Sequence, residues 1–160
     1  MARKDHPKTN ALRCLLKHGI PFEVLTYRYE PRGGTSVSAR ELGVDEHAVI
    51  KTLIMETNAR DPLIVLMHGD REVSTKRLAR TLKVKSVAPC EPKVADRHSG
   101  YQVGGTSPFG TRQTMDVYAE QSIFDLDCIY INAGHRGLLV RIDPNDMHKA
   151  LKITPVHVAI

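Results

Sequence analysis

Val49-Ile-Lys-Thr-Leu-Ile-Met55, followed by Leu63-Ile-Val-Leu-Met67, is the part of the sequence that best indicates how this chain folds. Both runs are rich in β-branched and large apolar residues, which favour extended structure. The Asp61-Pro62 pair between them is typical of a turn. We therefore expect two neighbouring strands that form the centre of a sheet.

Helix and strand signals alternate on either side of this pair. Helices are expected at 9–19, just before Gly43, at 74–82 and at 143–151, with Thr9, Ser74 and Asp143-Pro144 as their starting residues. Further strands are expected at 22–27, 86–88, 114–118, 128–131 and 138–142. Ser38 and Glu41 have the spacing of a capping box, and Asp45 is suited to cap one more turn. This alternation predicts an α/β or α+β fold with a mixed sheet.

The length and composition indicate one ordinary domain, residues 1–160. The chain has 160 residues, of which 41% are hydrophobic and 26% charged, and this composition argues against extended disorder. It contains no internal repeat or low-complexity tract. No run approaches the ~18 apolar residues that span a bilayer, and residues 1–6 lack the apolar core of a signal peptide. We therefore expect a cytoplasmic protein without membrane contact.

Charge, cysteine content and histidine content narrow the chemistry. Lys and Arg outnumber Asp and Glu by 23 to 18, and the net charge of +5 permits a phosphate-bearing partner without requiring one. The three cysteines include no Cys-x-x-Cys pair, and the eight histidines show no metal-binding spacing. We expect reduced thiols, no metal and no cofactor.

Lys51 is the first residue that stands out, because alternation along a strand places it on the same face as Leu53 and Met55. A buried ammonium requires a partner, and an inward-facing lysine often marks a site for an anion, a carbonyl or an acyl group. The alternative is a lysine that reaches water from the exposed start of the strand. The strand pattern by itself is consistent with both.

Gly100-Tyr-Gln-Val-Gly-Gly-Thr-Ser-Pro-Phe-Gly110 is the second such feature, with four glycines and one proline in eleven residues. Consecutive glycines allow the backbone to approach a ligand and to turn N–H groups toward developing negative charge, as an oxyanion site requires. The spacing fits neither a P-loop nor a dinucleotide-binding fingerprint. Alone, the segment is also consistent with a surface turn.

Asn132-Ala-Gly-His-Arg-Gly137 lies between two apolar segments and has the pattern of a hairpin whose left-handed positions are glycine. His135 and Arg136 would project from its tip, where Arg136 either holds a phosphate or is merely solvated. The sequence shows no local pattern of a Ser-His-Asp or Cys-His triad, so a side-chain nucleophile is not favoured.

In this order and spacing, these features resemble the YbaK and prolyl-tRNA synthetase-associated editing-domain family, specifically its stand-alone members that deacylate mischarged tRNA for proline. The resemblance covers roughly residues 20 to 151 and rests on Thr26-Tyr27, Glu41-Leu-Gly-Val44, Ile50-Lys-Thr-Leu53, Gly100-Tyr101-x-Val103-Gly104-Gly105-x-Ser107-Pro108-x-Gly110 and Tyr130-Ile131-x-x-Gly134-x-Arg136-Gly137. The Lys-Thr-Leu and Gly-Gly-x-Ser-Pro blocks at this separation are the specific part.

The resemblance implies a curved, mixed and partly barrel-like sheet surrounded by helices, with a pocket for a small aminoacyl group. It implies that Lys51 is the family's essential lysine and that Gly104 and Pro108 belong to a loop whose backbone amides bind the aminoacyl ester. The implied catalytic residues are Lys51, Gly104, Gly105, Thr106 and Ser107, and the implied substrate-binding residues are Tyr27, Gly34, Pro108, Asn132, Gly134, Arg136 and Leu139.

Three positions depart from the family members that act on cysteinyl-tRNA. Those members usually carry a phenylalanine in the loop where this chain has Gly33-Gly34, and they tend to have a serine where Asn132 stands and an aspartate where Leu139 stands. These positions shape the pocket. The resemblance therefore leaves cysteine, alanine or another small amino acid open.

The functional hypothesis is a trans-editing hydrolase in which water attacks the 3′ aminoacyl ester of mischarged tRNA for proline. Lys51 would anchor the substrate, and N–H groups of the 104–108 loop would stabilise the oxyanion. The implied partners are the acceptor end of an aminoacyl-tRNA and prolyl-tRNA synthetase, and the chain is expected to be a monomer or a weak dimer.

Two alternative functions are consistent with parts of the sequence. Residues 36–51 have the sequence pattern of a DNA-binding helix-turn-helix with Gly43 at the turn. Residues 45–55, however, are first acidic and then apolar and β-branched, which favours a strand. The other alternative is a non-catalytic module that binds aminoacyl-tRNA.

Overall fold

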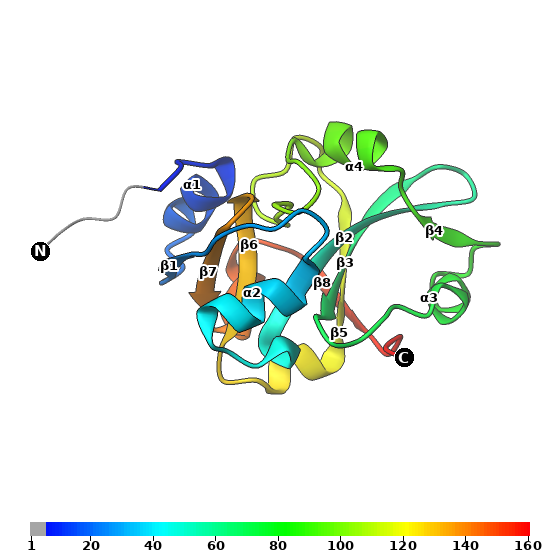
Figure 1. The fold of residues 1–160 in the computed structure, drawn as a ribbon. Helices are drawn as coiled ribbons and strands as arrows, with labels where there is room; N and C mark the ends of the chain where they lie inside the picture. The colour runs from blue at the N-terminus through cyan, green and yellow to red at the C-terminus, as the bar shows by residue number, and fades with distance from the viewer. Residues whose placement is uncertain (1–5) are drawn as a thin grey trace, which may run out of the picture.

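The computed structural model describes residues 6–160, which form a mixed sheet with helices around it (Figure 1). Residues 1–5 lie outside the described chain, and with them lies most of the segment on which the expectation about a signal peptide rests. Within the described residues, no helix is both long and apolar enough to cross a membrane.

Eight strands of the described residues form one sheet. They are β1 (Glu23–Thr26), β2 (Val49–Thr57), β3 (Pro62–His68), β4 (Val87–Pro89), β5 (Asp116–Glu120), β6 (Ile129–His135), β7 (Leu138–Ile142) and β8 (Ile153–Val156). Their order is β1-β7-β6-β2-β3-β5-β8, and β4 pairs with β2 off this path. The pairs β2–β6, β3–β5 and β5–β8 are parallel and the others are antiparallel. The predicted mixed sheet, centred on the β2–β3 pair, is therefore confirmed.

The helical elements of the described chain lie around this sheet. They are α1 (Asn10–Lys17), α2 (Gly34–Leu42), α3 (Thr75–Leu82), α4 (Pro92–Ser99) and the 3₁₀ helices η1 (Glu46–Ala48), η2 (Gln121–Asp125) and η3 (Pro144–Lys149). Thr9, Ser74, Asp45 and Asp143 cap α1, α3, η1 and η3 as predicted, because each side chain accepts a hydrogen bond from a backbone N–H of the first turn. Gly43 ends α2 in the left-handed conformation, also as predicted.

Other expectations are wrong. Helix α2 begins at Gly34, so Ser38 lies inside it and donates its hydroxyl to the Gly34 carbonyl in place of forming a capping box. The last helix is 3₁₀ and ends at Lys149. Neither α4 nor β8 was predicted. The helix-turn-helix alternative is also wrong, because the short turn η1 and then strand β2 follow α2 where a recognition helix would have to lie.

Strand β2 separates two hydrophobic clusters. Ile50 and Ile54 belong to the larger cluster, whereas Met55 belongs to a smaller one that includes residues of α3. Successive side chains of a strand point to opposite faces, so the two clusters occupy opposite faces of β2. Thr52 therefore faces the side of the larger cluster, and Lys51 faces the side of α3.

Strand β2 also changes its partner along one edge. It pairs with β6 only at residues 49–50 and with β4 only at residues 55–57. Even-numbered residues carry the backbone groups of this edge, since the Cys90 N–H donates to the Ile54 carbonyl there. Thr52 lies between the two pairings, and no strand of the described chain pairs with its backbone on this side. The sheet is open at this point.

A buried histidine joins the end of β3 to the turn before β2. His68 is 1% exposed and stacks on the His47 ring with 3.7 Å between the ring centres. Its Nδ1 lies 2.7 Å from the His47 carbonyl and its Nε2 lies 2.7 Å from the Ser122 hydroxyl. A carbonyl only accepts, so Nδ1 carries the proton and Nε2 accepts from Ser122. Burial lowers the pKa of His68, which favours this neutral form.

We predict that acidification destabilises the fold through His68. Because its pKa is lower in the folded than in the unfolded chain, the unfolded chain binds more protons as the pH falls through about 6.5, and the free energy of unfolding falls with it. Chemical denaturation between about pH 7.5 and about pH 5 should show a smaller loss in a His68→Gln variant than in the wild type. Exposed His18, changed to Gln, is the control; an equal pH dependence in all three proteins would contradict the prediction.

Candidate active site

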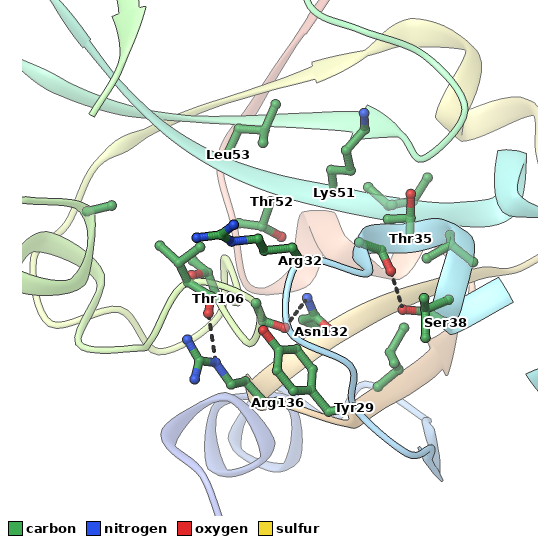
Figure 2. Close-up of a pocket in the computed structure, with 18 of the residues that line it drawn as sticks. Tyr29, Arg32, Thr35, Ser38, Lys51, Thr52, Leu53, Thr106, Asn132 and Arg136 are labelled. Atoms are coloured by element: carbon green, nitrogen blue, oxygen red, sulfur yellow. Dashed lines mark hydrogen bonds between the residues drawn. The ribbon is translucent and has the colours of Figure 1, made fainter. Parts of the chain in front are cut away.

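A cavity of about 620 Å³ lies where β2 and β6 separate (Figure 2). Its walls come from the segment between β1 and the middle of α2, from the first part of β2, from the end of β4 and the start of α4, from the loop before β5 and from β6 and β7. The volume is within the range of about 300–1,000 Å³ that is typical of small-molecule sites. The fold therefore places a ligand-sized cavity beside the opening of the sheet.

The structure brings together most of the predicted site residues and places the rest elsewhere. Those that line the cavity are Tyr27, Gly34, Lys51, Gly104, Thr106, Asn132, Arg136 and Leu139. Those that do not line it are Gly105, Ser107, Pro108 and Gly134.

The second group packs behind the cavity wall. The buried Ser107 hydroxyl accepts a hydrogen bond from the Phe109 N–H, which shapes the loop from within. A β-carbon at Gly105 would lie 2.6 Å from the backbone of the β6–β7 turn, and one at Gly134 would lie 2.7 Å from the Tyr101 ring. These positions therefore allow the loop and the turn to pack against each other.

The loop at residues 103–106 presents backbone groups to the cavity. Gly104 has a φ of +97°, and a β-carbon there would lie 2.6 Å from the Tyr29 hydroxyl, so both conformation and space favour glycine. The Gly105 N–H is already engaged by the Gln102 carbonyl. The N–H groups of Gly104 and Thr106 make no hydrogen bond within residues 6–160. These two groups are the donors of the loop that remain free for a ligand.

The wall formed by β6 and β7 combines one amide with apolar surface. Asn132 donates from Nδ2 to the Gly104 carbonyl at 3.4 Å, which ties β6 to the loop. Leu139 pairs with Asn132 across the two strands and is 1% exposed. Tyr27, just after β1, lines the same cavity. The position at which the resemblance implies an aspartate in related proteins is therefore a buried leucine here.

Lys51 lies on the predicted face of β2 but does not point into the cavity. Figure 2 shows its side chain and that of Leu53 on the opposite side of β2 from Thr52. The ammonium lies 3.4 Å from the carboxylate of Glu72, and the two side chains are 19% and 80% exposed. An ion pair with so exposed a carboxylate is weak, about 0–1 kcal/mol. Glu72 is thus a weakly held partner of Lys51, and another anion can replace it.

Thr52 points into the cavity and was not among the predicted site residues. Its Oγ1 is buried and has no hydrogen-bond partner in the described chain. Its backbone N–H and C=O lie on the open edge of β2 between the pairings with β6 and β4. Unsatisfied polar groups of this kind are costly unless a ligand or water completes them. Thr52 therefore presents two acceptors, its hydroxyl and carbonyl oxygens, and two donors, its O–H and backbone N–H, to the cavity.

Two guanidinium groups stand at the mouth of the cavity. Arg136 donates from Nε to the Val103 carbonyl at 3.0 Å and lies over the Tyr29 ring, 5.2 Å from its centre. Arg32 is exposed, adopts a φ of +61° and forms no ion pair within the described chain. Figure 2 shows that its side chain extends over the cavity. Sequence reasoning missed Arg32 and Tyr29, because no local pattern marked the loop they occupy. A guanidinium group is well suited to bind a phosphate.

The cavity contains no acid–base pair among the residues that line it. No histidine lines it, and its one carboxylate, Glu30, is exposed and pairs with Arg40 at 3.0 Å. Cys90 lines the cavity, but burial and the nearby Glu56 raise the pKa of its thiol to about 11. A protonated thiol is a poor nucleophile. The site thus offers hydrogen-bond donors and cations in place of a covalent catalyst.

The fold and the cavity define a small α/β domain with a ligand-sized cavity whose lining includes the 103–106 loop and the guanidinium-bearing residues Arg32 and Arg136. The family model described as "Aminoacyl-tRNA editing domain" matches residues 30–150. The chain belongs to this family. The predicted editing-domain membership is therefore confirmed, and with it the enzyme class of aminoacyl-tRNA ester hydrolases.

Similar proteins include both stand-alone chains and parts of synthetases. The chain is 27% identical over 143 residues to the Enterococcus faecalis protein named "Putative Cys-tRNA(Pro)/Cys-tRNA(Cys) deacylase EbsC", with 89% of this chain and 87% of that protein aligned. It is 30% identical over 122 residues to a proline--tRNA ligase of Ligilactobacillus salivarius, which covers 74% of this chain but only 21% of the ligase. The chain thus corresponds in length to the first protein and to one part of the second.

Solved structures share the fold. The crystal structure of a hypothetical protein has a TM-score of 0.87 at 19% identity and covers 95% of this chain and 100% of its own. The structure titled "Crystal structure of a putative trans-editing enzyme for prolyl tRNA synthetase" has a TM-score of 0.80 at 14% identity and covers 95% and 99%. The predicted fold class is confirmed by these neighbours.

We predict that Cys90 is unreactive near neutral pH. With a pKa of about 11 in place of the ordinary 9.0, its thiolate fraction and hence its rate of alkylation by iodoacetamide at about pH 8 should be about 100-fold lower than in the unfolded chain. Timed alkylation followed by peptide mass spectrometry measures this rate. The rate should continue to rise toward about pH 11. Equal rates in the folded and the urea-unfolded protein would contradict the assignment of a protonated thiol.

Proposed function

We propose that this chain hydrolyses the ester that joins a small amino acid, cysteine or alanine, to the 3′-terminal adenosine of tRNA for proline. The observation that carries the proposal is the cavity beside β2, which presents free donors on two sides and contains no competing nucleophile. Family membership and the name of the Enterococcus faecalis relative support the same class of substrate.

The aminoacyl ester would lie between the 103–106 loop and β2. The N–H groups of Gly104 and Thr106 would face the carbonyl oxygen, which gains negative charge as water attacks. On the other side, the hydroxyl and the backbone carbonyl of Thr52 would accept from the α-ammonium of the amino acid. Arg32 and Arg136 at the mouth would contact the terminal phosphate. Among the unpartnered groups of the loop and of Thr52, only the Thr52 N–H would then remain for a water molecule.

The chemistry needs only water and the substrate. The water oxygen forms a bond to the carbonyl carbon while the carbonyl electron pair moves onto oxygen. When that pair returns, the bond from carbon to the ribose oxygen breaks, and the ribose oxygen takes up a proton. The proton that the attacking water loses passes to solvent water or to the substrate, because no histidine lines the cavity. An aminoacyl ester is already activated, so orientation and oxyanion stabilisation would be sufficient.

Selection of the amino acid would depend mainly on size. The wall formed by Tyr27 and Leu139 is aromatic and apolar and includes no carboxylate that would fix the orientation of the α-ammonium. An apolar pocket discriminates by about 1–3 kcal/mol for each methylene. A larger side chain would therefore be excluded more strongly than cysteine and alanine would be distinguished from each other.

Replacement of Lys51 by Ala should lower kcat/KM for deacylation by about 100-fold or more, because we propose that its ammonium, which lies on the face of β2 opposite Thr52, exchanges Glu72 for a phosphate of the bound tRNA. Its current partner is an exposed carboxylate that a phosphate would displace. The measurement is release of amino acid from alanyl-, cysteinyl- and seryl-tRNA for proline, which also reports the preferred amino acid.

Glu72→Gln is the matched control for this variant. It breaks the same ion pair but leaves the ammonium in place, and it should retain deacylation and folding stability because an exposed pair contributes little. Equal loss of activity in both variants would show that Lys51 acts only through its contact with Glu72. Full activity in the Lys51→Ala variant would overturn the proposed role of this residue.

Thr52→Val should produce a gain in stability together with a loss of activity. Valine has nearly the same shape but lacks the unsatisfied hydroxyl, so the free energy of unfolding should rise by about 1 kcal/mol. If Oγ1 accepts from the substrate, kcat/KM should fall about tenfold, which corresponds to about 1.4 kcal/mol. Urea denaturation and the deacylation assay measure the two effects.

Thr52→Ser keeps the hydroxyl and is the control. It should retain most of the activity and should not gain stability. A Thr52→Val protein with wild-type kcat/KM would exclude a substrate contact for Oγ1, and a loss of stability would show that the hydroxyl already has a partner in the free protein.

A further inference from the structure

The excess positive charge of the chain is concentrated in one exposed segment. Residues 73–90 contain five lysines and arginines and no aspartate or glutamate. The remaining 18 lysines and arginines are balanced by 18 aspartates and glutamates. The net charge of +5 therefore equals the charge of this segment, which contains α3 and β4. The rest of the chain is formally neutral.

Helix α3 displays these cations on its solvent side. Lys76 and Arg80 lie about one turn apart on the same side of α3, and Lys83 follows directly after the last residue of the helix; these three form a stripe. Leu78 lies on the opposite side of the helix, where it is fully buried. Arg77 and Lys85 flank the stripe. All five side chains are exposed, and we call the surface they form the α3 basic surface.

The α3 basic surface has no counter-charge within the described chain. None of its five residues forms an ion pair with a described carboxylate, and the Arg77 guanidinium donates a hydrogen bond to the Ala159 carbonyl at 3.3 Å. Elsewhere on the surface, Arg40, Arg141 and Lys149 each lie within 4 Å of a carboxylate. Five clustered and unpaired cations repel one another and contribute nothing favourable to folding. Their arrangement is suited to a polyanion.

The α3 basic surface lies next to elements that form the cavity. Helix α3 leads into β4, and Pro89 at the end of β4 lines the cavity together with Cys90. Helix α3 also packs against the cluster on the face of β2 that carries Lys51. In Figure 1, α3 and β4 lie on the same side of the molecule, and α1 lies on the other. A nucleic acid whose 3′ end occupies the cavity is therefore within reach of α3.

We propose that the α3 basic surface binds the phosphate backbone of the tRNA whose 3′ end enters the cavity, an inference that rests on the proposed function. The stripe from Lys76 to Lys83 is about 10 Å long. One strand of a duplex presents roughly three phosphates over that length, which matches its three cations. The contact is electrostatic and carries no sequence information, so it strengthens binding of any tRNA and leaves the choice of amino acid to the cavity.

The test is the salt dependence of tRNA binding. A triple variant, Lys76→Gln, Arg80→Gln and Lys83→Gln, is compared with the wild type by titration of fluorescently labelled, uncharged tRNA for proline at increasing NaCl concentrations. Loss of three phosphate contacts should reduce the slope of log Kd against log salt by about 2 and weaken binding about 100-fold at about 0.1 M NaCl. Thermal unfolding should be unchanged, because all three side chains are exposed.

Two further variants control for charge and for position. Lys76→Arg with Arg80→Lys and Lys83→Arg keeps the charge and should bind as the wild type does. Lys8→Gln with Arg13→Gln and Lys17→Gln removes three cations at α1, on the far side in Figure 1, and should change the slope by less than 1. An equal loss in the α1 and α3 neutral variants would overturn the proposal, because binding would then report only net charge.

Deacylation measured in the same variants separates this inference from the proposed function. Single-turnover hydrolysis, with the protein in saturating excess over aminoacyl-tRNA, should proceed at the wild-type rate in the α3 neutral variant, because the cavity is untouched. Wild-type binding by that variant, with normal hydrolysis, would overturn the α3 contact and leave editing in place. Salt-dependent binding lost in that variant, with no hydrolysis by any protein, would support the contact and refute editing.

Discussion

The separation of β6 from β2 after Ile50 is the constraint on which the rest of the structure depends. A strand in a closed sheet has both edges paired, but β2 pairs with β6 for two residues and with β4 only from Met55 onward. The gap leaves an edge at Thr52 that water or a ligand must satisfy. Because β2 is held along its whole other edge by β3, this gap is fixed within the fold. The cavity is thus a consequence of strand pairing and does not require a mobile lid.

Alternation along β2 then decides which side chain meets the ligand directly. Thr52 points into the cavity with an unsatisfied hydroxyl, and Lys51 points to the other face, where it meets only an exposed carboxylate. An unsatisfied buried hydroxyl costs about 1–3 kcal/mol in the free protein, and a ligand that completes its hydrogen bond recovers this energy. The cavity is therefore organised before the ligand arrives, and the stability of the free protein is lower as a result.

Much of this arrangement could be predicted from local sequence, and the rest depended on contacts between distant segments. The central strands, the caps at Thr9 and Ser74 and the face of Lys51 follow from short-range rules. Strand β8 was missed because Pro155 weakens its pattern, although an edge position tolerates proline. Gly104 and Gly105 lie in a loop as predicted, but only Gly104 lines the cavity. That difference depends on packing against the Tyr29 hydroxyl and the β6–β7 turn, and these contacts leave no local signal. Family resemblance named Ser107 and Pro108, whereas burial places both behind the wall.

The backbone N–H groups of the 103–106 loop and the cations of α3 act at different stages of the proposed reaction. Backbone N–H groups at Gly104 and Thr106 lie where charge would develop during hydrolysis, so they would stabilise the transition state more than the bound ester and would raise kcat. The cations of α3 contact a part of the tRNA that does not change during the reaction, so they bind the ground state and the transition state equally and act on KM. A basic helix outside the cavity would thus let the affinity for tRNA vary with salt while the choice of amino acid does not. This separation matters for an editing enzyme, because correctly charged and mischarged tRNAs present the same phosphates. They differ only in the esterified amino acid, which would enter the cavity.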